Sequence, residues 1–290
     1  MLYSLYCSGT LIVKILPIKL CYVIADLVAR AYFFCSKRDK GMVRKNMRYV
    51  LGDGTSPAEI DRHVLGVFIN FAKYLVDFFK CSKLSREYIL KNVEIEGMHH
   101  LDECLAKGKG AVIVAVHLGN WELGGAVVGM MGYPINAIVL KHKDERINNI
   151  FMGRRAVNNL RNIPLGMQLK RCFKVLRSNE LLAIAADKDY TGSNEEVEFF
   201  GKKALMPKGA AALSLKTGAP IVFCAMIRQK NDTFRLVFEG PLRFKPTGDH
   251  DEDVRKLMRE YIQIFEKYIR AYPDQWYAFE EIWDRKKITR

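Results

Sequence analysis

Residues 111–117 read Ala-Val-Ile-Val-Ala-Val-His. A short, continuous apolar run rich in β-branched residues is typical of a strand that is buried on both faces, as in the centre of an α/β sheet. His117 follows this run directly, and Leu118-Gly119-Asn120 is expected to turn the chain into a helix over residues 121–131. The stretch therefore predicts a strand, a turn and a helix, with His117 at the carboxyl end of a central strand.

The flanking segments continue this alternation of strands and helices. The expected strands are residues 88–95, 135–140, 181–186, 221–228 and 234–239, and the expected helices are residues 55–80, 100–107, 145–160, 208–217 and 251–271. Ser56, Pro57 and Glu59 mark the start of the first of these helices, because together they form a capping box with proline in the first turn. The alternation predicts a single α/β domain with a mixed β-sheet flanked by helices.

The first 35 residues are apolar, but Lys14, Lys19 and Asp26 interrupt them. No uninterrupted apolar run reaches the roughly 18 residues that a spanning helix needs. A cluster of cations follows, comprising Arg30, Lys37, Arg38, Lys40, Arg44, Lys45 and Arg48. Apolar residues followed by cations suit a helix that lies in, or partly enters, a membrane with its cations on phosphate headgroups. We therefore expect residues 1–35 to form a membrane-anchoring helical segment; the alternative is a buried amphipathic helix.

The formal net charge of +14 favours a polyanionic partner. Nucleic acid would explain the charge but not the apolar first 35 residues, so we expect no nucleic-acid binding. The seven cysteines contain no CxxC pair and no zinc-binding spacing. They are expected to be reduced, with the main domain in the cytosol and no metal bound.

His117 and Glu122 are the candidate catalytic pair. On one ideal helix, five steps of about 100° would place them roughly 140° apart, so they can meet only across a strand-to-helix turn. A neutral imidazole can take the proton of a substrate hydroxyl as it attacks a thioester, and a carboxylate on its other nitrogen fixes the tautomer. The alternative interpretation is a capping histidine and a surface glutamate.

Several motifs carry a resemblance to a known family. They are His117-Leu-Gly-Asn-Trp-Glu122, Ala186-Asp187-Lys188-Asp189-Tyr190, Val197-Glu198-Phe199-Phe200-Gly201, Thr217-Gly218-Ala219-Pro220 and Tyr272-Pro273-Asp274-Gln275-Trp276-Tyr277. In this combination the chain resembles the lipid A late acyltransferases, the lauroyl/myristoyl family that shares the lysophospholipid acyltransferase fold. The resemblance covers most of the chain and implies that His117 is the general base and Glu122 its partner.

The resemblance also implies that residues 36–290 are an acyltransferase domain on the cytoplasmic face of the inner membrane. Its expected partners are an acyl-carrier-protein or coenzyme A thioester as donor and an anionic glycolipid, similar to a lipid A precursor, as acceptor. No metal or other cofactor is expected. Two alternatives are a different acceptor, such as a lysophospholipid or a mannosylated inositol lipid, and a non-catalytic lipid-binding protein of the same fold.

Five further residues are assigned to substrate binding. Arg154 and Arg155 lie where the family carries a functional arginine, and either could clamp a phosphate or steady an oxyanion. Asp187 and Asp189 follow an apolar strand, so we expect them at the carboxyl edge of the sheet, bearing on a substrate hydroxyl or on Arg154. Asn120, within the predicted turn, completes the set.

Overall fold

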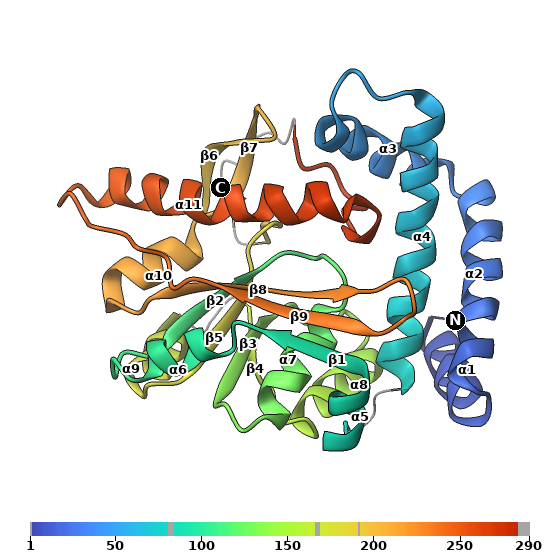
Figure 1. The fold of residues 1–290 in the computed structure, drawn as a ribbon, viewed down its shortest axis with the longest axis horizontal. Helices are drawn as coiled ribbons and strands as arrows, with labels where there is room; N and C mark the ends of the chain where they lie inside the picture. The colour runs from blue at the N-terminus through green and yellow to red at the C-terminus, as the bar shows by residue number, and fades with distance from the viewer. Residues whose placement is uncertain (1, 81–83, 166–168, 191, 284–290) are drawn as a thin grey trace.

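In the computed structural model, which describes residues 2–80, 84–165, 169–190 and 192–283, a seven-stranded sheet forms the centre of the molecule (Figure 1). Its strands lie in the order β1 (Val93–Glu96), β9 (Phe234–Glu239), β8 (Ile221–Arg228), β2 (Ala111–Ala115), β5 (Leu181–Ala185), β3 (Ile135–Val139) and β4 (Arg161–Pro164). All neighbours are parallel except β8 and β9, which are antiparallel. The predicted mixed sheet in a single α/β domain is confirmed.

Strand β2 occupies the middle of this sheet and is buried on both faces, as its apolar run predicts. Val112 and Val114 belong to the core on one face, while Ala111 and Ile113 belong to the core on the other. Helices cover both faces of the sheet, and this explains why β2 lacks the polar alternation of a half-exposed strand.

Helices are divided between the two faces (Figure 1). The face of Val112 is covered by α9 (Leu169–Arg177), α10 (Gly209–Thr217) and α11 (His250–Ala271). The opposite face is covered by α5 (Arg86–Asn92), α6 (His99–Leu105) and α7 (Trp121–Met130), and α8 (Glu145–Ala156) packs beside β4. A separate antiparallel hairpin of β6 (Asn194–Phe199) and β7 (Lys202–Pro207) packs against α11, and the short 3-10 helix η1 (Pro273–Gln275) follows that helix.

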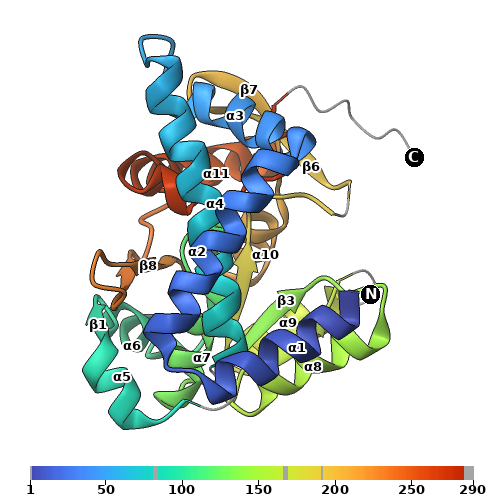
Figure 2. The same ribbon diagram turned by 90° about the vertical axis from the view of Figure 1, so that its right-hand side faces the viewer.

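The N-terminal part of the described chain consists of the helices α1 (Leu2–Ile15), α2 (Ile18–Cys35), α3 (Lys37–Leu51) and α4 (Pro57–Lys80). The Ser56 hydroxyl accepts from the Glu59 amide at 3.2 Å, so the predicted cap of α4 is confirmed. Helix α2 runs along α4, and α1 lies beside their lower ends (Figure 2).

The first two helices leave many large apolar side chains exposed. They are Leu5, Leu11, Ile12, Ile15, Leu20, Val23, Ile24, Leu27, Val28, Tyr32 and Phe34. Within the described residues, no helix combines the length and the apolar content needed to cross a membrane. The predicted anchoring segment is thus two helices, and their association with a membrane stays a prediction.

Some predicted elements were wrong. The strand expected over residues 88–95 is mostly helix α5, because Ser85 caps it by accepting from the Tyr88 amide at 3.1 Å, and only the short β1 follows. The helix expected over residues 145–160 ends at Ala156, which leaves room for β4. Helix α9 and the β6–β7 hairpin were not predicted. Of the seven cysteines, Cys81 lies outside the described residues, and the other six are free thiols as expected.

Candidate active site

His117 is held rigidly in a turn at the carboxyl end of β2. Its carbonyl accepts from the Tyr277 amide at 2.9 Å, and the Gly119 amide donates to the Gln275 carbonyl at 2.9 Å. Gly119 has a φ of 64°, and a Cβ on it would lie only 1.9 Å from the Met226 carbonyl oxygen. The turn therefore requires glycine, and residues 275 and 277 of the C-terminal segment hold it by hydrogen bonds.

Asp187 is the carboxylate that binds His117. Its Oδ1 lies 2.7 Å from His117 Nδ1, and its Oδ2 accepts from the His117 amide at 3.0 Å. The Trp276 indole also donates to Oδ2, at 3.0 Å. The Asp187 side chain has no exposed surface and that of His117 is 17% exposed. Three donors therefore fix the carboxylate, and the carboxylate fixes the ring.

The electrostatics of this pair set the tautomer of His117. Burial alone would raise the pKa of Asp187, but the charge and hydrogen bond of His117, with Lys188 and Trp276, hold it below its ordinary value. An ionised Asp187 accepts the proton on Nδ1, so the lone pair of the imidazole lies on Nε2. His117 is thus arranged to take a proton from a group that approaches Nε2.

The predicted contact between Glu122 and His117 is not found. Among the described residues no hydrogen bond joins them; instead Arg155 donates to Glu122 through Nε at 2.8 Å and through Nη2. The side chain of Glu122 is only 11% exposed and that of Arg155 is 12% exposed. Glu122 lies in the first turn of α7, where it faces α8 rather than the end of β2. Asp187 therefore takes the orienting place that the sequence assigned to Glu122.

The other predicted binding residues have structural contacts. Asn120 is 2% exposed and caps α7 by accepting from the Leu123 amide at 3.0 Å. Arg154 donates to the Phe78 carbonyl and, at 3.0 Å, to the Thr10 hydroxyl.

Both aspartates of the Asp-Lys-Asp segment are engaged within the chain as well. Asp189 accepts from the Gly192 amide at 2.8 Å, which is a loop-capping contact. Asp187, fully buried against His117, presents no surface to a substrate hydroxyl. Its assignment to substrate binding is therefore corrected to that of a partner of His117.

Strand register could have revealed the pairing of His117 with Asp187. Parallel neighbours β2 and β5 align Ala115 with Ala185, and each is followed two residues later by the polar member of the pair. Two apolar strands that end in the same way at one sheet edge were visible in the sequence. Their adjacency was not, because the sequence does not state that β5 rather than β3 lies beside β2.

Aromatic rings border His117. The Trp121 ring lies edge-on to the imidazole with centroids 4.9 Å apart, and the Tyr74 ring stacks on Trp121 at 4.6 Å. Tyr277 adds a third ring, 5.9 Å from Trp121. These rings make a low-dielectric wall beside the imidazole, which strengthens its interaction with the carboxylate.

A histidine oriented by a buried carboxylate, at the carboxyl edge of an α/β sheet, defines a proton-transfer site of the kind used to activate a hydroxyl. The model of the bacterial lipid A biosynthesis acyltransferase family matches residues 1–285, and the chain belongs to this family. It is therefore an acyltransferase.

Similar proteins fall into two groups. A phosphatidylinositol mannoside acyltransferase of Mycobacterium tuberculosis is 26% identical over 289 residues, covering 96% of this chain and 87% of the relative. One of Mycolicibacterium smegmatis is 25% identical, covering 96% and 90%. A lipid A biosynthesis palmitoleoyltransferase of Escherichia coli is 25% identical over 271 residues, covering 89% and 82%.

Proposed function

We propose that this enzyme transfers a fatty acyl group from a thioester donor to a hydroxyl of an anionic glycolipid, with His117 as the general base. The observation that carries the proposal is the 2.7 Å contact between His117 Nδ1 and the buried Asp187. With Nδ1 bound to Asp187, Nε2 is available to accept a proton. The acyltransferase family to which the chain belongs supports this role.

The reaction requires one proton to move twice. His117 Nε2 takes the proton of the acceptor hydroxyl while that oxygen attacks the thioester carbonyl carbon. The tetrahedral intermediate then collapses, the carbon–sulfur bond breaks, and the imidazolium returns the proton to the leaving thiolate. Asp187 stabilises the imidazolium between these two steps. The substrate supplies the nucleophile, so no acyl-enzyme intermediate is needed.

Glu122 has a positioning role in this proposal. Its bidentate pair with Arg155 connects the first turn of α7 to α8, and that turn continues directly from the His117 turn. Bidentate arginine–carboxylate pairs restrict orientation as well as distance. Glu122 and Arg155 thus fix the direction in which α7 leaves the catalytic turn.

The acceptor class rests on the relatives and on charge. Their names give lipid A and phosphatidylinositol mannoside, which are both anionic glycolipids, and this chain carries a net charge of +14. We propose an acceptor of that class, with a lysophospholipid as the second candidate. The donor is proposed to be an acyl-carrier-protein or coenzyme A thioester, and no metal or other cofactor takes part.

The enzyme is proposed to act on the cytoplasmic face of the inner membrane. Helices α1 and α2 supply the exposed apolar residues, and the exposed cations Lys37, Arg38 and Arg48 lie on the adjoining α3. Apolar insertion and attraction to anionic headgroups act together in such interfacial helices.

Product analysis tests this function. The purified protein is incubated with an isotope-labelled acyl-carrier-protein or coenzyme A thioester and, in separate reactions, a lipid A precursor, a mannosylated phosphatidylinositol and a lysophospholipid. Mass spectrometry should show one added acyl group, in ester linkage, on a glycolipid. Acylation of the lysophospholipid alone would replace the acceptor class. Thioester binding without transfer to any lipid would support the non-catalytic alternative and overturn the proposal.

A further inference from the structure

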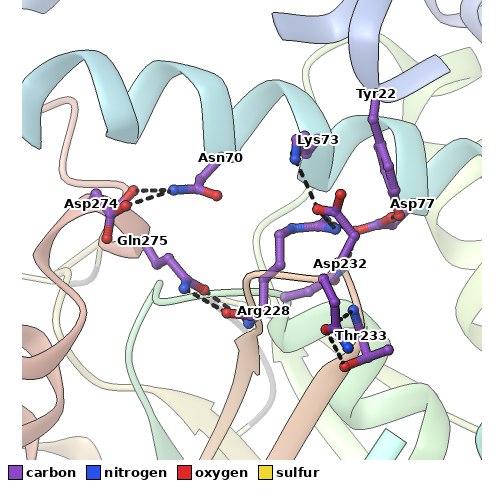
Figure 3. Close-up of polar contacts among 11 residues, drawn as sticks. Tyr22, Asn70, Lys73, Asp77, Arg228, Asp232, Thr233, Asp274 and Gln275 are labelled. Atoms are coloured by element: carbon purple, nitrogen blue, oxygen red, sulfur yellow. Dashed lines mark hydrogen bonds and ion pairs between the residues drawn. The ribbon is translucent and has the colours of Figure 1, made fainter. Parts of the chain in front are cut away.

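A buried polar cluster, distinct from the His117–Asp187 pair, lies between α2, α4 and the end of β8 (Figure 3). Its centre is Asp77 of α4, which is 2% exposed. The Tyr22 hydroxyl of α2 donates to Oδ1 at 2.5 Å, the Asn120 amide group donates to Oδ2 at 2.9 Å, and the Arg228 guanidinium donates to Oδ2. One carboxylate therefore joins three separate parts of the chain.

The cluster is neutral, which makes its burial tolerable. Arg228 bonds to both Asp77 and Asp232, and Lys73 pairs with Asp232 at 2.8 Å, so two cations alternate with two carboxylates. Burial raises the pKa of Asp77, and Arg228 is the strongest of the partners that oppose this. A buried pair that loses a partner is strongly destabilised, so the geometry around Asp77 is closely constrained.

On one side the cluster reaches the catalytic turn. Asn120 stands three residues after His117, and while its amide group donates to Asp77, its carbonyl oxygen caps α7 through the Leu123 amide at 3.0 Å. Its backbone amide also donates to the Met226 carbonyl at 2.8 Å. All polar groups of this buried side chain are thus committed between Asp77 and α7. A displacement of Asp77 would be passed to the turn that carries His117.

On the other side the cluster reaches the helix proposed to contact lipid. Tyr22 is 7% exposed and its ring lies beneath Arg228 and Lys73, with the cations 5.0 and 5.2 Å from the ring centre. Elsewhere around α2, Val23 is 56% and Leu27 62% exposed. One face of α2 therefore holds the Asp77 cluster, while apolar side chains on another face are exposed in the described part of the chain.

We propose that Asp77 is a positioning residue that couples the seating of α2 on a lipid surface to the geometry of the His117 turn. Lipid held against the outer face of α2 limits excursions of this helix away from α4 and keeps the Tyr22 hydroxyl on Asp77. Asp77 then holds Asn120, and Asn120 holds the turn. The coupling is reciprocal, so a well-ordered turn also favours the seated α2. This inference rests on the proposed membrane docking.

The matched pair of variants is Tyr22→Phe and Tyr268→Phe. Each removes one buried tyrosine hydroxyl that donates to a carboxylate, but Tyr268 lies on α11 and its hydroxyl bonds Glu239 at 2.5 Å, outside the Asp77 cluster and outside helices α1 and α2. Amide hydrogen exchange of residues 119–124 is measured by mass spectrometry with and without vesicles of phosphatidylglycerol and phosphatidylethanolamine. Cosedimentation and the thermal unfolding midpoint are recorded for each variant.

In the wild type, vesicles should slow exchange in residues 119–124. Tyr22→Phe should bind vesicles as well as the wild type does. With vesicles present, however, residues 119–124 of this variant should exchange about fivefold faster than those of the wild type, which is the factor that one net hydrogen bond supplies. Tyr268→Phe should match the wild type. With vesicle-borne acceptor, Tyr22→Phe should lower kcat while the KM for the donor is unchanged. Asp77→Asn, which keeps the shape of the side chain but removes its charge, should reproduce the loss at a larger cost in stability, because it takes the charge partner from buried Arg228. If neither variant folds, exchange in the wild type with and without vesicles still tests the coupling.

Full vesicle-induced slowing in a folded Tyr22→Phe variant would overturn the coupling. So would a wild type that binds vesicles without any change in residues 119–124. Failure to bind vesicles at all would overturn both the docking and the coupling, but transfer to a detergent-dispersed glycolipid would still be observed. Absence of that transfer would instead overturn the proposed reaction.

Discussion

Replacing Asp187 by asparagine removes the charge that His117 needs while keeping the side-chain volume. The carboxylate accepts three hydrogen bonds, from the His117 ring at 2.7 Å, the His117 amide at 3.0 Å and the Trp276 indole at 3.0 Å. An asparagine oxygen can serve the amide and the indole, but its NH₂ group then faces Nδ1 and favours the tautomer with the proton on Nε2. The lone pair would be on the wrong nitrogen.

The expected loss in kcat is about 10³–10⁴-fold, the size seen when the orienting carboxylate of a catalytic histidine is neutralised. The KM values should change little, because Asp187 is fully buried and does not face substrate. The assay is single-turnover transfer from a labelled acyl thioester at saturating donor, with circular dichroism to verify the fold. A folded Asp187→Asn variant with more than about a tenth of wild-type kcat would refute this reasoning.

The same variant should alter the pH dependence of stability. The pKa of Asp187 is lower in the folded protein than its unfolded value of about 3.9, so its contribution is complete above that value and is lost as the pH falls below it. Urea unfolding should show the wild type ahead of Asp187→Asn by about 2 kcal/mol at neutral pH, the scale of a hydrogen bond to a charged group. The difference should shrink below about pH 4, and a constant difference would contradict the assigned shift.

Three further substitutions have definite expected outcomes. Gly119→Ala should lower the free energy of unfolding in urea titrations by at least about 2 kcal/mol and abolish transfer, because the φ of 64° and the Met226 carbonyl oxygen 1.9 Å from the new Cβ leave no room. The control Gly41→Ala in α3 should raise the free energy of unfolding by about 1 kcal/mol, and equal effects of the two variants would contradict this prediction. Glu122→Ala should lower the free energy of unfolding by about 3 kcal/mol, because it leaves the buried Arg155 guanidinium without its carboxylate. The double variant that also replaces Arg155 by alanine should recover most of this free energy, and no recovery would mean that the broken pair is not the cause of the loss. Leu27→Ser should weaken vesicle binding about tenfold in a cosedimentation assay. Leu90→Ser, which replaces a side chain 76% exposed on α5, should leave vesicle binding unchanged, and an equal loss in both variants would contradict the assignment of α2 as the lipid-facing helix.

Much of the fold could be predicted because its signals are local. The apolar run of β2 is stable only in a strand covered on both faces, where its side chains pack into a core on each face. Ser56 marks the start of a helix because its hydroxyl accepts from the Glu59 backbone amide. The strand predicted over residues 88–95 is wrong because Ser85 caps a helix at this point, and a short helix and a short strand share the apolar residues of the segment.

The candidate site was predicted only in part because its contacts are long-range. His117 could be found from its place after β2, but its partner comes from β5, seventy residues later in the chain. The resemblance to the family motif assigned this role to Glu122, which is the nearest carboxylate in sequence. In the structure the Glu122 carboxylate pairs with Arg155, whose position depends on how α8 packs. Spacing along the chain does not encode which parallel strands become neighbours.

The role of His117 as general base is tested most directly by comparing acyl transfer in His117→Ala and His99→Ala. His99 is an exposed histidine on α6 that serves as a control for the loss of an imidazole. Initial rates with a labelled acyl thioester and the glycolipid acceptor should fall by at least about 10³-fold in folded His117→Ala and stay at wild-type level in His99→Ala. Substantial transfer by a folded His117→Ala protein would contradict the account, because no proton acceptor would then be needed at the end of β2.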